Sequence, residues 1–117
     1  MAIGTPTSIG TASDLSSIGS DPLVITTTST AVVGDEIIVM ITGRGSRSWA
    51  SISDSAGNTY TSMGSDSSGS TNTDTKAQTY RAKVTAQLTS GGTITISNSG
   101  ISAGGTLAEA VMVSGVT

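Results

Sequence analysis

The sequence contains no cysteine and no histidine. Without cysteine the chain can form no disulfide bond and offers no thiolate as a ligand or nucleophile. Without histidine it cannot build the usual zinc sites or a Ser-His-Asp triad. These absences remove the commonest routes to hydrolytic catalysis, so we expect a protein that is not an enzyme and carries no cofactor.

Charged and aromatic residues are scarce. Five Lys and Arg stand against eight Asp and Glu, for a net charge of −3, and charged residues form 11% of the chain. No basic stretch is present to hold phosphates, so we expect no nucleic-acid partner. One Trp, two Tyr and no Phe leave few rings to stack on sugars. The chain has instead 21 Ser and 20 Thr, which predict hydroxyl-covered faces.

Long hydrophobic stretches are also missing. No apolar run approaches the roughly 20 residues of a membrane-spanning helix, so we expect no membrane partner. The first ten residues, MAIGTPTSIG, have neither the basic nor the apolar segment of a signal peptide. We therefore expect synthesis in the cytoplasm of the producing cell. The length of 117 residues predicts one domain.

The sequence does contain a series of short β-branched or alternating segments. We expect strands at residues 23–28, 36–42, 49–54, 59–63, 76–88, 93–97 and 107–113. Seven or eight short strands without a helical pattern predict an all-β fold, an antiparallel β-sandwich over residues 23–117. Residues 1–22, interrupted by Pro6 and Pro22, predict an extended N-terminal arm with room for one edge strand.

The segment IIVMI, residues 37–41, is the longest apolar run in this series. Five consecutive apolar residues predict a strand that is covered on both faces. One face would pack into the core. The other would lie against a second subunit or beneath the N-terminal arm.

The segment SDSAGNTY, residues 53–60, separates two expected strands. Gly57 and Asn58 tolerate the positive φ of a tight hairpin turn. Asp54 and Ser55 can accept hydrogen bonds from the backbone N–H groups of that turn. We therefore predict a hairpin between residues 49–54 and 59–63, capped by Asp54.

Two groups of acidic residues are candidates for chemistry. Asp54 could act as a general base beside Glu109 or Asp35, but capping of the turn is the interpretation we favour. Asp66 and Asp74 lie in GSDSSGSTNTDT, residues 64–75, which reads as a surface loop. Oxygen-rich loops can hold Ca²⁺, although this spacing matches no known calcium loop, so the question of a calcium ion there stays open.

Candidate partner contacts lie in two segments. In GRGSRSW the side chains of Arg44 and Arg47 are candidates for contacts with an acidic partner, while Trp49 is expected in the core. In the arm the isolated apolar residues are candidate anchors on neighbouring subunits: Ile3, Ile9, Leu15 and Ile18. Arg81 and Lys83 share the polar face of an expected strand, and on an edge strand such cations would discourage edge-to-edge aggregation.

Four segments together resemble a known kind of domain. VVGDEIIVMITG resembles a strand beginning G-D-x-hydrophobic, and SISDSAGNTYTSMG resembles a V-x-D-S-x-G-N-x-Y/W hairpin. GGTITISNS and LAEAVMVSGVT resemble a G-x-x-x-I-x-V strand and a closing E-x-S-G-V strand, although Glu109 stands further from the Ser-Gly pair than in that pattern. Segments of this kind occur in this order in Ig-like or jelly-roll β-sandwich domains of bacterial surface proteins and tailed-phage virions. The resemblance covers about residues 22–117.

The resemblance implies a structural role. A single domain of this type resembles a phage capsid decoration, or cement, protein, which binds and stabilises the head lattice. It implies a place on the virion surface, the major capsid protein or another virion protein as partner, and self-association, for example as a trimer. The alternatives are a phage tail or fibre component, or a cell-surface carbohydrate-binding module with residues 43–48 and 64–75 as its rim.

Overall fold

The computed structural model describes residues 4–14, 23–44, 49–67, 75–98 and 106–115. Within them lie eight strands and no helix, hence none that could span a membrane. The strands are β1 (Thr7–Asp14), β2 (Leu23–Thr26), β3 (Glu36–Arg44), β4 (Trp49–Asp54), β5 (Thr61–Ser67), β6 (Thr75–Lys83), β7 (Thr93–Asn98) and β8 (Thr106–Val113).

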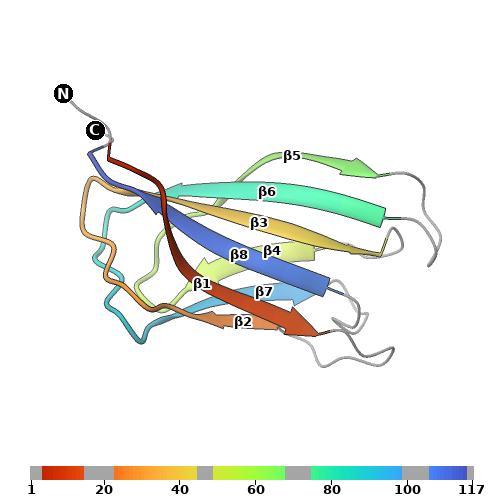
Figure 1. Ribbon diagram of the computed structural model, residues 1–117, viewed down its shortest axis with the longest axis horizontal. Helices are drawn as coiled ribbons and strands as arrows, with labels where there is room; N and C mark the ends of the chain where they lie inside the picture. The colour runs from red at the N-terminus through yellow and green to blue at the C-terminus, as the bar shows by residue number, and fades with distance from the viewer. Residues whose placement is uncertain (1–3, 15–22, 45–48, 68–74, 99–105, 116–117) are drawn as a thin grey trace.

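The strands form two antiparallel sheets that face each other (Figure 1). One sheet has five strands in the order β1-β8-β3-β6-β5, and the other has three in the order β2-β7-β4. The all-β fold compatible with a β-sandwich, expected from the strand pattern, is confirmed.

The core lies between the two sheets. Most strands alternate buried and more exposed residues, as the period of two requires, so one face of these strands supplies the core, whereas residues 61–64 of β5 are exposed. A fully buried aliphatic side chain contributes roughly 1.5–3 kcal/mol relative to an exposed one. The largest fully buried aliphatic side chains are Ile9, Ile25, Ile37, Val39, Ile41, Val84, Leu88, Ile94 and Ile96.

One side of the sandwich is closed where β1 meets β2. The N–H of Thr28 donates to the carbonyl of Ile9 at 2.8 Å, which links the two sheets. The close approach depends on Gly10, because a Cβ at that position would lie 2.6 Å from Cγ2 of Ile25 and 2.8 Å from the carbonyl oxygen of Thr26. The first edge of the large sheet is therefore joined to the first edge of the small one.

Strand β1 changes the interpretation of the N-terminal arm. Residues 7–14, expected within an arm that reaches residue 22, pair along β8 and belong to the sandwich. Ile9 was expected to anchor the arm on a partner, and this is wrong, because its side chain is fully buried in this chain's own core. The segment Thr7–Thr11 forms part of this edge strand although Ile9 is its one large apolar residue, because the Ile9 side chain reaches the core. A truncation of residues 1–20 would remove that strand as well as the arm.

The predicted hairpin at residues 54–58 is also wrong. β4 pairs only with β7 in the small sheet, whereas β5 pairs with β6 in the large one. The connection between β4 and β5 therefore crosses from one sheet to the other. Gly57 has a positive φ of 88°, as expected, but no described residue other than glycine has one, so Asn58 does not.

The bounds of β5 and β6 also differ clearly from expectation. β5 extends through Ser67, so the first part of residues 64–75 is strand rather than loop. β6 ends at Lys83, and the remaining part of residues 76–88 belongs to the connection with β7, where Leu88 forms an isolated bridge with Ala31. Alternation of side chains continues past the strand because both Val84 and Leu88 still reach the core.

Candidate functional site

The carboxylate of Asp54 organises the crossing between the sheets. Its Oδ1 atom accepts hydrogen bonds from the backbone N–H groups of Ala56, Gly57 and Asn58 at 2.9, 2.8 and 3.1 Å. Its Oδ2 atom accepts from Nδ2 of Asn58 at 3.0 Å and from the hydroxyl of Tyr60 at 2.9 Å. The predicted capping by Asp54 is confirmed, and both carboxylate oxygens are used within the turn.

Asn58 connects this turn to the segment that follows β6. Its side chain is 5% exposed. The Oδ1 atom accepts from the N–H groups of Thr85 and Ala86, both at 2.9 Å, and Nδ2 donates to the carbonyl of Ala86 at 2.9 Å as well as to Asp54. A buried amide with all these groups satisfied holds two chain segments at a fixed distance.

Tyr60 is the third side chain of this group. We call Asp54, Asn58 and Tyr60 together the corner between the sheets. Burial raises the pKa of the Tyr60 hydroxyl far above its ordinary range, and the charge of Asp54 and the hydrogen bond to it raise that pKa further. The hydroxyl therefore stays protonated and donates to the carboxylate. Together the three side chains explain the motif D-x-x-x-N-x-Y in this chain as a structural corner.

The carboxylates considered as partners of Asp54 lie elsewhere. Glu109 belongs to β8 in the large sheet, whereas Asp54 ends β4 in the small one. Asp35 is buried in the turn before β3, where its Oδ2 atom accepts from the N–H of Val32 at 2.9 Å. The structure thus gives Asp54 and Asp35 separate turns to stabilise.

Apart from that of Ile9, the side chains proposed as partner contacts lie outside the description. Arg44 ends β3 with its backbone opposite Thr75, and its side chain is not described. Trp49 begins β4, and its side chain is likewise not described. The side chains of Asp66 and Asp74, on which the open question of calcium depends, are outside the description too. The remaining candidates, Ile3, Leu15, Ile18 and Arg47, lie outside the described residues.

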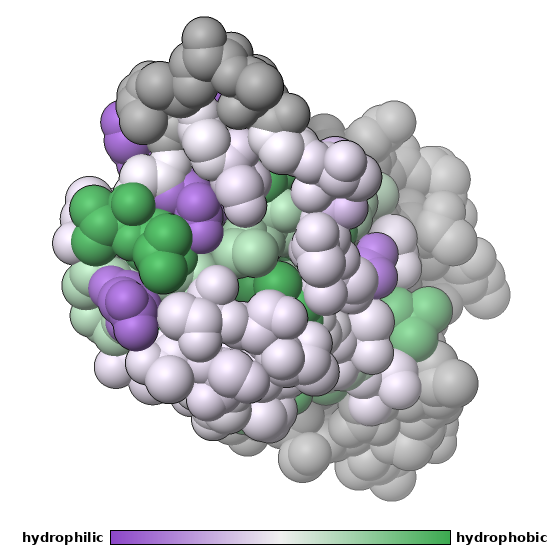
Figure 2. All heavy atoms as spheres, turned by 60° about the vertical axis from the view of Figure 1, so that its left-hand side comes forward, coloured by the Kyte–Doolittle hydropathy of each residue, from purple (hydrophilic) through white to green (hydrophobic). Residues whose placement is uncertain are grey.

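Two apolar side chains project from the turn that precedes β3. The N–H of Asp35 donates to the carbonyl of Val32 at 3.0 Å, and Gly34 has a φ of 101°, so the turn is tight. Val33 at its tip is 65% exposed and Val32 is 46% exposed. Figure 2 brings this end of the molecule forward and shows a hydrophobic group at the surface beside hydrophilic ones. Two valines beside a Gly-Asp pair, where turns usually carry polar residues, are the sequence signal for this exposed apolar tip.

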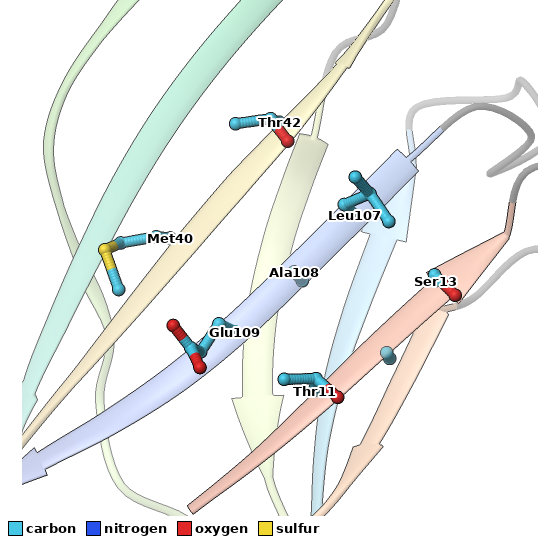
Figure 3. Close-up of a pocket in the computed structure, with 8 residues that line it drawn as sticks. Thr11, Ser13, Met40, Thr42, Leu107, Ala108 and Glu109 are labelled. Carbon is cyan, nitrogen blue, oxygen red and sulfur yellow. The ribbon is translucent and has the colours of Figure 1, made fainter. Parts of the chain in front are cut away.

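The outer face of the large sheet carries a second exposed apolar surface. Met40 of β3 is 39% exposed and Leu107 of β8 is 47% exposed. They border a hollow of about 460 Å³ over β1, β8 and β3, together with Thr11, Ser13, Thr42 and Glu109. In Figure 3 the side chains of Met40, Glu109 and Leu107 rise from neighbouring strands on this face. The predicted second cover over residues 37–41 is therefore absent from the described part of this single chain.

Comparison with known proteins does not assign these surfaces. No protein-family profile matches the chain, and neither does any curated protein or any solved structure.

Proposed function

We propose that this protein is a non-enzymatic structural protein of a virion, a decoration protein that binds and stabilises the head lattice of a tailed phage. Its partner would be the major capsid protein or another virion protein. The order of four turn and strand motifs, which resembles that of virion β-sandwich domains, supports the virion assignment. Its place would be the capsid surface.

The observation that carries the binding role is the exposed valine pair at the tip of the Val32–Asp35 turn. The turn is fixed by hydrogen bonds of Asp35, so its two apolar side chains are presented to solvent in a defined geometry. Burial of a fully exposed valine is worth roughly 1.5 kcal/mol or more, and a contact of this size is weak for one copy. A lattice that repeats the contact many times converts weak contacts into stable attachment.

The polar network between the sheets is compatible with a role in binding. The corner formed by Asp54, Asn58 and Tyr60 uses its polar atoms within the chain. Because these polar atoms bond within the chain, binding of a partner would depend on the exposed side chains of the surface. The low charge of those surfaces favours contacts made by apolar and hydroxyl groups.

Co-sedimentation with particles purified from the source of the chain tests the proposal. We expect saturable binding at a fixed number of copies per head, and loss of that binding in the Val33→Asp variant. Val24→Asp is the matched control, because Val24 is a 43% exposed valine on the outer face of the small sheet. Protein that stays in the supernatant at all concentrations refutes the proposal, and binding to separated tails but not heads would replace it with a tail component.

A further inference from the structure

We propose that the outer face of the five-stranded sheet is a self-contact, on which two copies of this chain pack face to face about a two-fold axis. The contact would form in the purified protein. Its test therefore does not depend on the proposed role in a virion.

The centre of this face is apolar. In β3 the residues between the buried Ile37, Val39 and Ile41 point outward, which places Ile38 and Met40 on the face. In β8 the buried Ala108 and Ala110 alternate in the same way with outward residues, of which Leu107, Val111 and Val113 are apolar. The strand register sets Val111 directly opposite Ile38, so the two strands form one continuous apolar surface.

The outer face of the small sheet has a different composition. Its central strand β7 turns Thr93 and Thr95 outward, and its edge strand β4 turns Ser51 and Ser53 outward. Hydroxyl groups of this kind are well hydrated when exposed. Among the described residues of this sheet, Val24 is the large apolar residue that is exposed. Among the side chains that the structure describes, the two outer faces therefore differ, and the large sheet has the exposed apolar centre that a protein contact requires.

Charges on the large face are arranged to complement a second copy. Glu109 lies on β8, on one side of β3, where its Oε2 atom accepts from the hydroxyl of Ser8 at 3.0 Å. Arg81 and Lys83 lie on β6, on the other side of β3, opposite Ile38 and Glu36. A two-fold axis parallel to β3 places the β8 half of one copy over the β6 half of the other. Glu109, level with Met40 and Thr79, then lies over β6 of the other copy, two residues along that strand from Arg81, and the axis repeats this contact.

The cations retain enough freedom to take part. The Nε atom of Arg81 lies 3.7 Å from Oε1 of Glu36, and the Arg81 side chain remains 59% exposed. The Glu36 side chain is only 18% exposed, so the long Arg81 side chain would have to keep this contact while its exposed part reaches the second copy. The hollow beside Met40 and Glu109 supplies space for side chains of the second copy (Figure 3).

The size of the face fits a concentration-dependent pair. Five strands about 4.8 Å apart, each about eight residues long at roughly 3.4 Å per residue, cover roughly 600 Å² per copy. Stable interfaces bury about 800 Å² per partner, so this contact would lie near the lower limit. Association is therefore expected to depend on protein concentration and to be sensitive to one charge placed at its centre.

Sedimentation equilibrium over a concentration series tests the pair, with circular dichroism to confirm that each variant is folded. We expect the mass to rise from that of one 11.5 kDa chain to twice that value. Met40→Glu should hold the protein at the mass of one chain. Val24→Glu, a matched change on the small sheet, should leave association unchanged.

A charge exchange provides a second test that does not depend on Met40. Glu109→Lys and Arg81→Glu should each weaken association, and the double variant should restore it, because the opposite charges again face each other across the axis. A single-chain mass at every concentration overturns the proposal. So does a trimer, or association that survives Met40→Glu, and equal losses in all three charge variants would overturn the two-fold arrangement.

Discussion

Replacement of Asn58 by alanine tests whether the corner between the sheets stabilises the fold. The variant loses hydrogen bonds to the N–H groups of Thr85 and Ala86, to the carbonyl of Ala86 and to Asp54, all between 2.9 and 3.0 Å. A lost hydrogen bond costs about 1 kcal/mol, and a buried group left without a partner costs about 1–3 kcal/mol. We expect a loss of roughly 3–6 kcal/mol, a large part of the roughly 5–15 kcal/mol that stabilise a small domain.

Urea unfolding followed by far-ultraviolet circular dichroism measures this loss. With a slope of about 2 kcal/mol per molar urea, a loss of about 4 kcal/mol lowers the midpoint by about 2 M. Thr59→Ala is the control, because Thr59 is the exposed neighbour of Asn58 and should change the midpoint little. A loss below about 1 kcal/mol for Asn58→Ala would refute the reasoning, because the network would then contribute no more than a single average hydrogen bond.

Asn58→Asp separates the shape of the side chain from its hydrogen bonds. The second carboxylate oxygen would stand where Nδ2 now lies 3.0 Å from Oδ2 of Asp54 and 2.9 Å from the carbonyl of Ala86. These oxygens favour the protonated form and raise the pKa of the introduced carboxyl in the folded state above its value of about 3.9 in the unfolded chain. The stability of this variant should therefore fall as the pH rises from about 4 to 7. A flat profile over that window would contradict the assigned donor and acceptor atoms.

Two further predictions concern the tyrosines and Gly10. Burial raises the pKa of Tyr60 and Tyr80 in the folded state, so their contribution to stability is complete below about pH 10, the ordinary tyrosine value, and is lost at higher pH. Ionisation of Tyr60 should consequently appear together with unfolding in an alkaline titration, and tyrosinate absorbance from both tyrosines in the intact fold would contradict this. Gly10→Ala should lower the free energy of unfolding by about 1–3 kcal/mol through overpacking against β2, as measured in urea beside Ser13→Ala, and an unchanged midpoint would show that the sheets can separate without cost.

Much of the secondary structure could be predicted because it depends on local sequence. β4 was predicted with the boundaries that it has in the structure, and β7 and β8 to within one residue at an end. The capping role of Asp54 was also predictable, because a carboxylate beside a turn reaches backbone N–H groups within four residues.

The candidate surfaces were only partly predictable. The apolar run at residues 37–41 correctly indicated a strand, but the second cover that it predicted is absent from the described part of this single chain, where Met40 is 39% exposed. It did not indicate that Leu107, Val111 and Val113 join Ile38 and Met40, since β8 reaches β3 from more than sixty residues away in the chain. The exposure of Val33 depended on the turn geometry that Asp35 fixes.

The sequence by itself therefore determined that the chain is all-β, where most strands lie, and that residue 54 caps a turn, because these properties follow from alternation, β-branching and short-range hydrogen bonds. Only the tertiary structure decided that β4 and β5 belong to different sheets, that Ile9 is a core residue, and that Asn58 joins the crossing to the segment after β6. The physical reason is that strand pairing satisfies backbone groups equally well with a neighbouring or a distant strand. The choice between them is made by the burial of side chains from the whole chain in one core.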